Sequence, residues 1–222
     1  MEEFAKVYYA DFGEFIENES LVSERLGELD EKRRQRIAKA RHSDIKAQIM
    51  AGGLIIRAAL KDSFGIDEFE LAENEFGKPY VVGRPDVHFN ISHSGKVVVC
   101  AVSDTECGVD VEDLSVSHDI MGVATRFMSV LEYDAMMMSE NPNRAFCRLW
   151  TLRESYVKMR GRGFDIGLST LKCDFHLGKA KISEQGVEQN DAFFKEIYGI
   201  IGYQAAMCTN GERESTVKRL KL

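Results

Sequence analysis

The sequence predicts an α+β fold made of two similar αβ halves with antiparallel sheets, on two observations. Each half combines one long segment of helical period with short runs of β-favouring residues. In addition, the run Tyr203–Thr209 echoes the run Lys96–Val102, since each follows a glycine-containing turn and carries a cysteine. We expect a ligand site in the cleft between the halves. The predicted halves are residues 1–112 and residues 113–222.

In the N-terminal half, hydrophobic period and punctuation residues define the elements. Phe4 to Phe12 alternates enough to be a first strand. Asp30 is placed to cap the basic segment that follows it. Ser43 or Asp44 opens the longest apolar-periodic helix, which Gly65 ends. Three shorter elements are also predicted, a helix over Leu21–Leu29 and strands over Phe69–Ala72 and Pro79–Val82.

The stretch from Phe89 to Glu112 is the one around which the rest is arranged. Its first residues, FNISHSG, are predicted to form a polar turn, and Lys96–Ser103 is a strand too apolar to be exposed on either face. After a turn, VDVE alternates, so that Asp110 and Glu112 share one strand face. Because like charges in this position repel, a cation between them or access of water is required. The pattern predicts a hard-metal site.

The C-terminal half is read in the same way. Asp119–Phe127 is a predicted helix, and Ser129 with Glu132 forms a capping box that opens another. Arg144–Arg160 is a third helix, which stops at Gly161. Four antiparallel strands are expected beyond it, over Leu171–Leu177, Ala180–Ser183, Ala192–Tyr198 and Tyr203–Thr209.

Composition limits the classes of partner. The formal net charge of −7 over 222 residues argues against nucleic acid, whereas the basic segment Lys32–Arg41 suits a small anion. Five cysteines without a CxxC pair indicate reduced thiols. The N-terminal residues lack the pattern of a secretory signal, and no apolar run reaches membrane-spanning length. We therefore expect a cytoplasmic protein that binds no membrane.

A third acid belongs with the two strand carboxylates. Trp150, Glu154 and Lys158 stand four apart and share one helix face. Taken alone, this spacing more often means a surface Glu–Lys pair beside a core tryptophan. If Glu154 joins Asp110 and Glu112, however, the three carboxylates form an oxygen shell that suits Mg²⁺.

Two further features suit an anionic ligand. His93 lies in a Ser-His-Ser sequence just before the buried strand, where a lone histidine is usually a structural hydrogen-bond partner. Lys78 follows Gly77 and precedes Pro79, so a rigid backbone could aim its ammonium group at an anion. A functional role for His93 and Lys78 is indicated only if phosphate groups lie nearby.

Taken together, FNISHSG, GVDVE and WTLRESYVKMRGRG resemble the three signature blocks of the 4′-phosphopantetheinyl transferases of the Sfp type. EFGKP and RFMSVLEY extend the resemblance, which spans roughly Lys32 to Gly163. Three blocks in the right order are far more specific than a single glycine motif. The resemblance implies a monomeric pseudodimer of two αβ halves, with coenzyme A in an active site between them.

The resemblance also implies roles for individual residues. It makes Asp110, Glu112 and Glu154 the ligands of Mg²⁺, for which Mn²⁺ could substitute, and it gives catalytic roles to Glu154, Lys158 and Asp110. His93 would lie near the 3′-phosphate of coenzyme A, and Lys158 would face its pyrophosphate. The implied binding set for coenzyme A is Lys32, Arg36, Lys78, Pro79, Ser92, His93 and Lys158.

This chain departs from the family pattern at two positions. Arg153 stands before the third-block glutamate, where relatives commonly have lysine, so the charge is kept but its geometry changes. Gln35 stands where a lysine is common in relatives. Arg36 or Lys39 would then supply the missing charge for the phosphate.

The implied reaction is phosphoryl transfer from coenzyme A to a serine of an apo acyl or peptidyl carrier protein. 3′,5′-adenosine bisphosphate leaves, and Glu154 is the candidate general base, directly or through a bound water. Two alternatives stay open. One is a coenzyme A-binding regulatory protein without transfer activity, against which the retained acids and Lys158 speak. The other is a metal-dependent phosphohydrolase, for which a second histidine beside the acids is missing.

Overall fold

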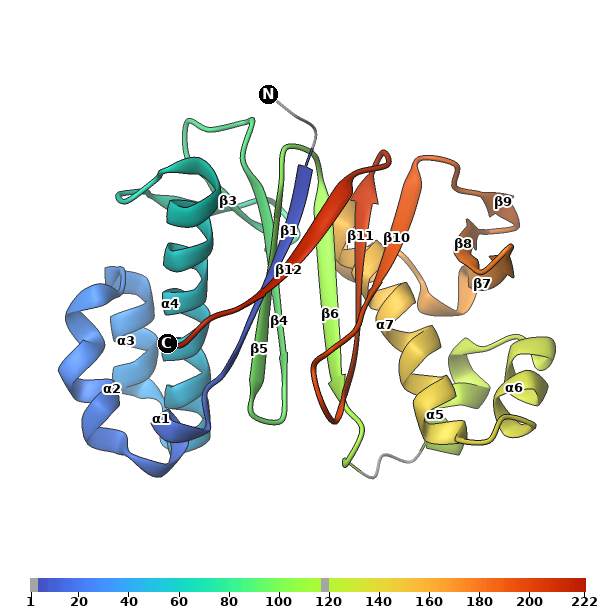
Figure 1. The fold of residues 1–222 in the computed structure, drawn as a ribbon, viewed down its shortest axis with the longest axis horizontal. Helices are drawn as coiled ribbons and strands as arrows, with labels where there is room; N and C mark the ends of the chain where they lie inside the picture. Colours follow the sequence, from blue (N-terminus) through green and yellow to red (C-terminus); the bar gives the residue numbers. More distant parts are fainter. Residues whose placement is uncertain (1–3, 117–119) are drawn as a thin grey trace.

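The computed structural model describes residues 4–116 and 120–222. Two separate sheets stand at the centre of the molecule, and each carries one long helix on its outer side (Figure 1). The first sheet has the strand order β12-β1-β5-β4, and the second has the order β10-β11-β6. Their bounds are β1 Phe4–Asp11, β4 His88–Ser94, β5 Val97–Ser103, β6 Cys107–Asp113, β10 Ala192–Ile197, β11 Tyr203–Asn210 and β12 Glu214–Arg219.

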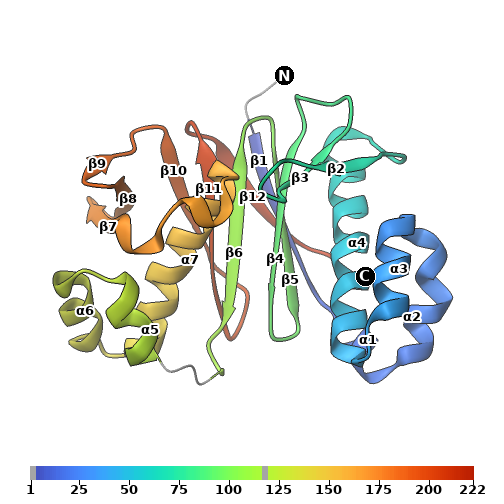
Figure 2. The ribbon, with the colours of Figure 1, turned by 180° about the vertical axis from the view of Figure 1, so that it is seen from behind.

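The helix α4 (Ser43–Phe64) covers the outer face of the first sheet, and α7 (Pro142–Arg160) covers the second (Figures 1 and 2). Both helices end as their sequences indicate. Gly65 and Gly161 take the left-handed conformation just past the last helical residue, which glycine adopts without steric cost. At the other end of α7, Asn141 caps the helix and Pro142 occupies its first turn.

Every residue of β5 is buried, because apolar layers pack against both of its faces. Val98, Cys100 and Val102 face α4, whereas Val97 and Val99 belong to the core between the two sheets. In β6, Val109 and Val111 also point into that central core. The opposite face of β6, which carries the two carboxylates, is therefore turned toward α7.

The smaller elements lie around this centre. On the N-terminal side, α3 packs against α4, and the β2–β3 hairpin lies beyond β4. On the C-terminal side, a separate three-stranded sheet and two short helices flank α7 (Figure 2). Their bounds are α1 Gly13–Glu17, α2 Glu19–Arg25, α3 Glu31–Lys39, β2 Leu71–Glu73, β3 Pro79–Val81, α5 Ile120–Phe127, α6 Val130–Met137, β7 Leu171–His176, β8 Lys179–Glu184 and β9 Val187–Glu188.

The predicted α+β fold with two similar halves and antiparallel sheets is confirmed. Besides smaller changes, such as β2 at Leu71–Glu73 and the unpredicted α1 and β9, three differences from expectation affect the central sheets. FNISHSG continues as the strand β4 through Ser94, β6 begins already at Cys107, and β12 pairs in parallel with β1. This return of the chain brings a C-terminal strand into the N-terminal sheet, and the division after residue 112 stays a prediction. None of the helices that the structure describes is both long and apolar enough to cross a membrane.

Candidate active site at the crossing of β6 and α7

The strands β4 and β6 run side by side at the edges where the two sheets meet (Figures 1 and 2). Polar side chains of β4 bridge them. Asn90 Oδ1 accepts a hydrogen bond from the backbone N–H of Val109 at 2.9 Å, and Ser94 Oγ accepts one from Asp113 at 3.0 Å. The residues up to Ser94 form a strand and not a turn because every second one, Asn90, Ser92 and Ser94, faces β6 and bonds to it.

Asp110, Ser92 and Lys158 meet in one cluster at this seam. Ser92 Oγ donates to Asp110 Oδ1 at 2.8 Å, and Lys158 Nζ lies 2.6 Å from the same oxygen. Lys158 Nζ also donates to Ser92 Oγ at 2.9 Å. Three elements, β4, β6 and α7, thus each contribute one side chain, and Lys158 supplies a cation for the acidic face of β6.

Gly108 allows α7 to approach β6 this closely. A Cβ at this position would lie 2.1 Å from the backbone oxygen of Ser155 and 2.3 Å from the backbone nitrogen of Met159. Backbone atoms of a helix cannot turn aside as a flexible side chain can. The glycine that opens GVDVE therefore sets the distance between Lys158 and Asp110.

The other two acids flank this cluster. Ser94 Oγ donates to Glu112 Oε2 at 3.1 Å, so Glu112 is also held from β4. On α7, the pKa of Glu154 is raised by burial and by the negative charges of Asp110 and Glu112, against the opposing effect of Lys158. Glu154 thus lies within electrostatic reach of both strand carboxylates.

The donor set suits a hard divalent cation in its chemistry. Asp110 Oδ2 is buried and has no hydrogen-bond partner, which is a costly state unless another ligand satisfies the oxygen. In the described ranges, no three His, Cys, Asp or Glu side chains are grouped closely enough to hold a metal ion as they stand. The three acids fit such an ion by donor type and charge, although their side chains are not gathered around one point, and the unpartnered oxygen makes Asp110 the position best prepared for it.

His93 lies on the face of β4 that is turned toward α4, away from Ser92. Its ring contacts the side-chain amide of Gln48 on α4. Partial burial and the charge of Lys158 lower the pKa of His93, although Asp110 opposes this shift. Gln48 was missed by the sequence analysis, because a single polar residue in a long helix gives no signal without its spatial neighbours.

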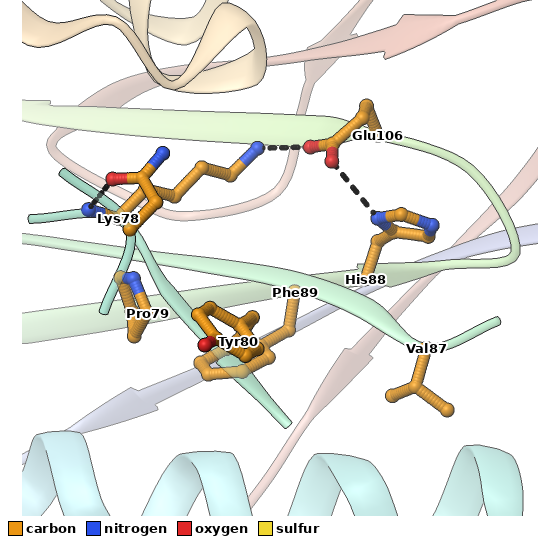
Figure 3. A pocket seen from close by; sticks show the side chains of 8 residues that line it. Lys78, Pro79, Tyr80, Val87, His88, Phe89 and Glu106 are labelled. Atoms are coloured by element: carbon orange, nitrogen blue, oxygen red, sulfur yellow. Dashed lines mark hydrogen bonds and ion pairs between the residues drawn. The ribbon is translucent and has the colours of Figure 1, made fainter. Parts of the chain in front are cut away.

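Lys78 and Pro79 lie at a small pocket between the β2–β3 hairpin and β4, with a volume of about 170 Å³ (Figure 3). The ammonium group of Lys78 contacts Glu106, and it donates to the backbone oxygen of Met159 at 2.9 Å. His88 Nδ1 lies 3.3 Å from the other oxygen of Glu106, so that Glu106 bridges the lysine and the histidine (Figure 3). Lys78 thus ties the hairpin to the last turn of α7.

The two predicted residues of α3 stand apart from the Asp110 cluster. Lys32 Nζ pairs with Glu73 Oε1 of β2 at 2.6 Å, and both side chains are exposed. Arg36 is exposed on α3. Neither contacts another predicted site residue in the described part of the chain, but both lie on the N-terminal side that carries Gln48 and His93.

Arg153 has a structural role in this chain. It is fully buried, pairs with Glu132 at 2.5 Å, and also donates to the backbone oxygens of Leu149 and Leu171. Glu132 is the same residue that closes the capping box of α6 with Ser129. The arginine therefore points away from Glu154 and joins α6 to α7 and β7.

Comparisons with known proteins give matches over most of the chain. Residues 106–208 match the family model described as the 4′-phosphopantetheinyl transferase superfamily, and residues 19–105 match the model of the N-terminal part of a 4′-phosphopantetheinyl transferase. A 4′-phosphopantetheinyl transferase of Bacillus subtilis is 32% identical over 154 residues, which cover 65% of this chain and 67% of that protein. The 4′-phosphopantetheinyl transferase Sfp of Bacillus subtilis (strain 168) is 26% identical over 180 residues, which cover 79% and 80%.

Among solved structures, the holo-[acyl-carrier-protein] synthase of Thermotoga maritima aligns with a TM-score of 0.39 at 15% identity. The alignment covers 49% of this chain and 64% of that one.

Proposed function

Because this chain belongs to the 4′-phosphopantetheinyl transferase superfamily, we propose that it transfers the 4′-phosphopantetheine group of coenzyme A to a serine of an apo acyl or peptidyl carrier protein. One observation carries the proposal beyond the family. Lys158 and Asp110 meet at 2.6 Å beside an unpartnered buried carboxylate oxygen, within electrostatic reach of Glu154. This combination of an ammonium group, carboxylates and a carboxylate oxygen without a hydrogen-bond partner suits the binding of a pyrophosphate with its metal ion.

The proposed reaction is a displacement at the β-phosphorus of coenzyme A. The serine oxygen of the carrier forms a new P–O bond, and the bond from this phosphorus to the bridging oxygen of the pyrophosphate breaks. 3′,5′-adenosine bisphosphate leaves with that oxygen. The serine proton passes to Glu154, directly or through one water, so that charge and atoms balance.

The residues of the chain act mainly by positioning and by neutralising charge, as is general for phosphoryl transfer. Lys158 would face the pyrophosphate and offset the negative charge that develops on the leaving group. Asp110 and Ser92 hold the ammonium group of Lys158 in place. Asp110, Glu112 and Glu154 would hold Mg²⁺ or Mn²⁺, which supplies further charge neutralisation at the phosphate oxygens when bound.

At the nucleotide end, His93 and Gln48 would contact the 3′-phosphate, and Lys32 and Arg36 would add positive charge from α3. The pocket beside Lys78 and Pro79 has room for part of the adenosine. These assignments rest on position and charge, since His93 and Gln48 form one polar contact between β4 and α4.

The test is to incubate the protein with Mg²⁺, coenzyme A and an apo carrier protein, and to measure the mass of the carrier. A gain of one phosphopantetheine group, with one 3′,5′-adenosine bisphosphate released, supports the proposal. Unchanged carrier together with tight binding of coenzyme A would instead support a regulatory protein without transfer activity. Release of free phosphate from coenzyme A would point to a phosphohydrolase.

A further inference from the structure

The bridges between β4 and β6 repeat with a fixed register. Ser92 Oγ donates to Asp110 Oδ1 at 2.8 Å, and two residues further along both strands Ser94 Oγ donates to Glu112 Oε2 at 3.1 Å. Each carboxylate on the α7 face of β6 is therefore held by one hydroxyl of β4. Since the period of a strand is two, alternate serines of β4 reach alternate acids of β6.

Ser94 makes a second bond that Ser92 does not make. Its Oγ also accepts the backbone N–H of Asp113 at 3.0 Å, so one hydroxyl holds both the side chain of Glu112 and the next peptide group. Asp113 itself is engaged elsewhere, because its Oδ1 accepts bonds from the backbone and hydroxyl of Ser115. The last residues of β6 are thus fixed from β4 at the point where the strand ends.

This bond acts on the carboxylate at the end of a long side chain. Glu112 is only half-buried, and a glutamate has three rotatable bonds whose ordering costs free energy. A hydrogen bond from an outer residue to a metal-ligating carboxylate fixes its orientation before the ion arrives. Ser94 has the geometry for this role at Glu112, and burial and Lys158 fix the carboxylate of Asp110.

We propose that Ser94 is a positioning residue, which holds the carboxylate of Glu112 on the α7 face of β6 so that it can bind the divalent cation. The inference rests on the proposed function, because it presupposes a metal centre at Asp110, Glu112 and Glu154. It adds a residue outside the ligand set, and it predicts an effect on metal affinity rather than on coenzyme A affinity.

The experiment compares Ser94→Thr with Ser94→Val. The two new side chains have nearly the same shape and both favour strands, but only threonine keeps the hydroxyl group. Binding of Mn²⁺ is measured by electron paramagnetic resonance without carrier protein, so that no turnover occurs, both with and without coenzyme A. Loss of the bond should raise the Mn²⁺ dissociation constant of the valine variant about tenfold or more, and the threonine variant should stay near the wild type.

Ser115→Ala serves as the matched control, since it removes a hydroxyl three residues beyond Glu112 that donates to Asp113 Oδ1 at 2.6 Å. It should leave Mn²⁺ binding unchanged. Equal Mn²⁺ affinity in Ser94→Val and the wild type would overturn the role of Ser94, as would equal losses in the valine and threonine variants. If Ser94→Val unfolds while Ser94→Thr stays folded, the hydroxyl serves to hold the backbone of Asp113. That result would also overturn the proposed positioning role.

The same measurement separates this inference from the proposed metal centre. Asp110→Ala should lose Mn²⁺ binding under the same conditions. If the wild type takes up no Mn²⁺, or if Asp110→Ala binds it as well as the wild type does, the metal centre itself is refuted. If the wild type binds Mn²⁺ and Asp110→Ala does not, the result for Ser94→Val decides on Ser94 alone.

Discussion

The ammonium group of Lys158 lies 2.6 Å from Oδ1 of Asp110, which joins the last turns of α7 to the middle of β6. This contact helps to explain how two acids can share one strand face next to a hydrophobic core. A cation from the neighbouring helix stands beside Asp110, and Glu112 is half-buried and bonded to Ser94. The site therefore has internal neutralisation before any ligand binds.

The first prediction concerns Asp110. Asp110→Ala should lower the transfer rate by about a hundredfold or more, since a metal ligand and the partner of Lys158 are lost together. The fold should persist because Lys158 is 27% exposed and can turn to water. Transfer assays and thermal melting of the same preparation check both statements. Glu112→Gln should have a milder effect, and a fully active Asp110→Ala would rule out the site.

A second prediction follows from the close crossing of helix and strand. Gly108→Ala should destabilise the protein by about 1–3 kcal/mol, because the added methyl group meets backbone atoms of α7. It should also lower kcat, since α7 must move Lys158 away from Asp110. Urea unfolding and steady-state kinetics measure the two effects. The control is Gly27→Ala, where a Cβ would have no neighbour within 4 Å; similar results for both variants would contradict the close approach.

The sequence predicted most of the elements that build the site, for identifiable physical reasons. The alternation in VDVE shows which residues share a face of one strand. In the same way, the spacing of Glu154 and Lys158 shows that they share a face of one helix. Both conclusions depend only on local geometry. The capping box at Ser129 and the glycine stop of α7 are likewise local, and both are observed.

What the sequence did not predict depends on contacts between distant residues. The strand character of β4 was hidden because its polar positions, such as Asn90 and Ser94, are satisfied only by β6. Gln48 gains meaning only through His93, 45 residues away. The pairing of β12 with β1 joins the two ends of the chain. The prediction for Arg153 depended on its position next to Glu154 in the sequence, whereas its role in the fold depends on its burial and on its ion pair with Glu132.

The third prediction concerns the nucleotide end of coenzyme A. If His93, Lys78 and Lys32 lie near the 3′-phosphate, replacing each by alanine should weaken the binding of coenzyme A about tenfold or more. The binding of dephospho-coenzyme A should weaken much less. Titration calorimetry with both ligands gives the comparison, and the difference should shrink as salt is added. Lys179→Ala, which removes an exposed lysine on β8, is the control. Equal losses for the two ligands would place these residues elsewhere.

The fourth prediction is a pH dependence of stability that arises at Glu106. Burial opposes ionisation of this carboxyl, but the hydrogen bond from His88 and the charge of Lys78 outweigh it and lower the pKa of Glu106 from its ordinary 4.5 to about 2. A lowered pKa means that the stabilisation is complete above the unfolded value and is lost as the pH falls toward 2.

Glu106→Gln should therefore be less stable than the wild type at neutral pH, by about 1 kcal/mol because water screens a half-exposed carboxylate. The gap should close between pH 4.5 and pH 2. Urea unfolding of both proteins at a series of pH values tests this. A gap that stays constant down to pH 2 would show that the ionised carboxylate is not its source.

The last prediction concerns docking of the carrier protein on α5, the helix that follows the acid-bearing strand. The segment Ser117–Val130, SHDIMGVATRFMSV, follows that strand in the sequence, and its residues 117–119 lie outside the described residues. Within α5, Ala124 is buried and Ile120 packs on the core below, whereas Met121 is 51% exposed and Arg126 is exposed. An exposed apolar side chain and an exposed arginine on one helix suit an acidic, partly apolar partner helix.

Charge reversal at Arg126 combined with Met121→Glu should raise the KM for the carrier about tenfold or more, since both contacts would become repulsive. Affinity for coenzyme A and the melting temperature should stay nearly unchanged, because both side chains are exposed and the bond from the Tyr133 hydroxyl to the Met121 sulfur is also exposed. The control is Lys172→Glu combined with Leu177→Glu, which makes the same chemical changes at exposed positions of β7 and the turn after it. This control should not change the KM for the carrier. Should the Met121 and Arg126 double variant unfold, or lose coenzyme A binding to the same degree, α5 belongs to the core and the carrier docks elsewhere.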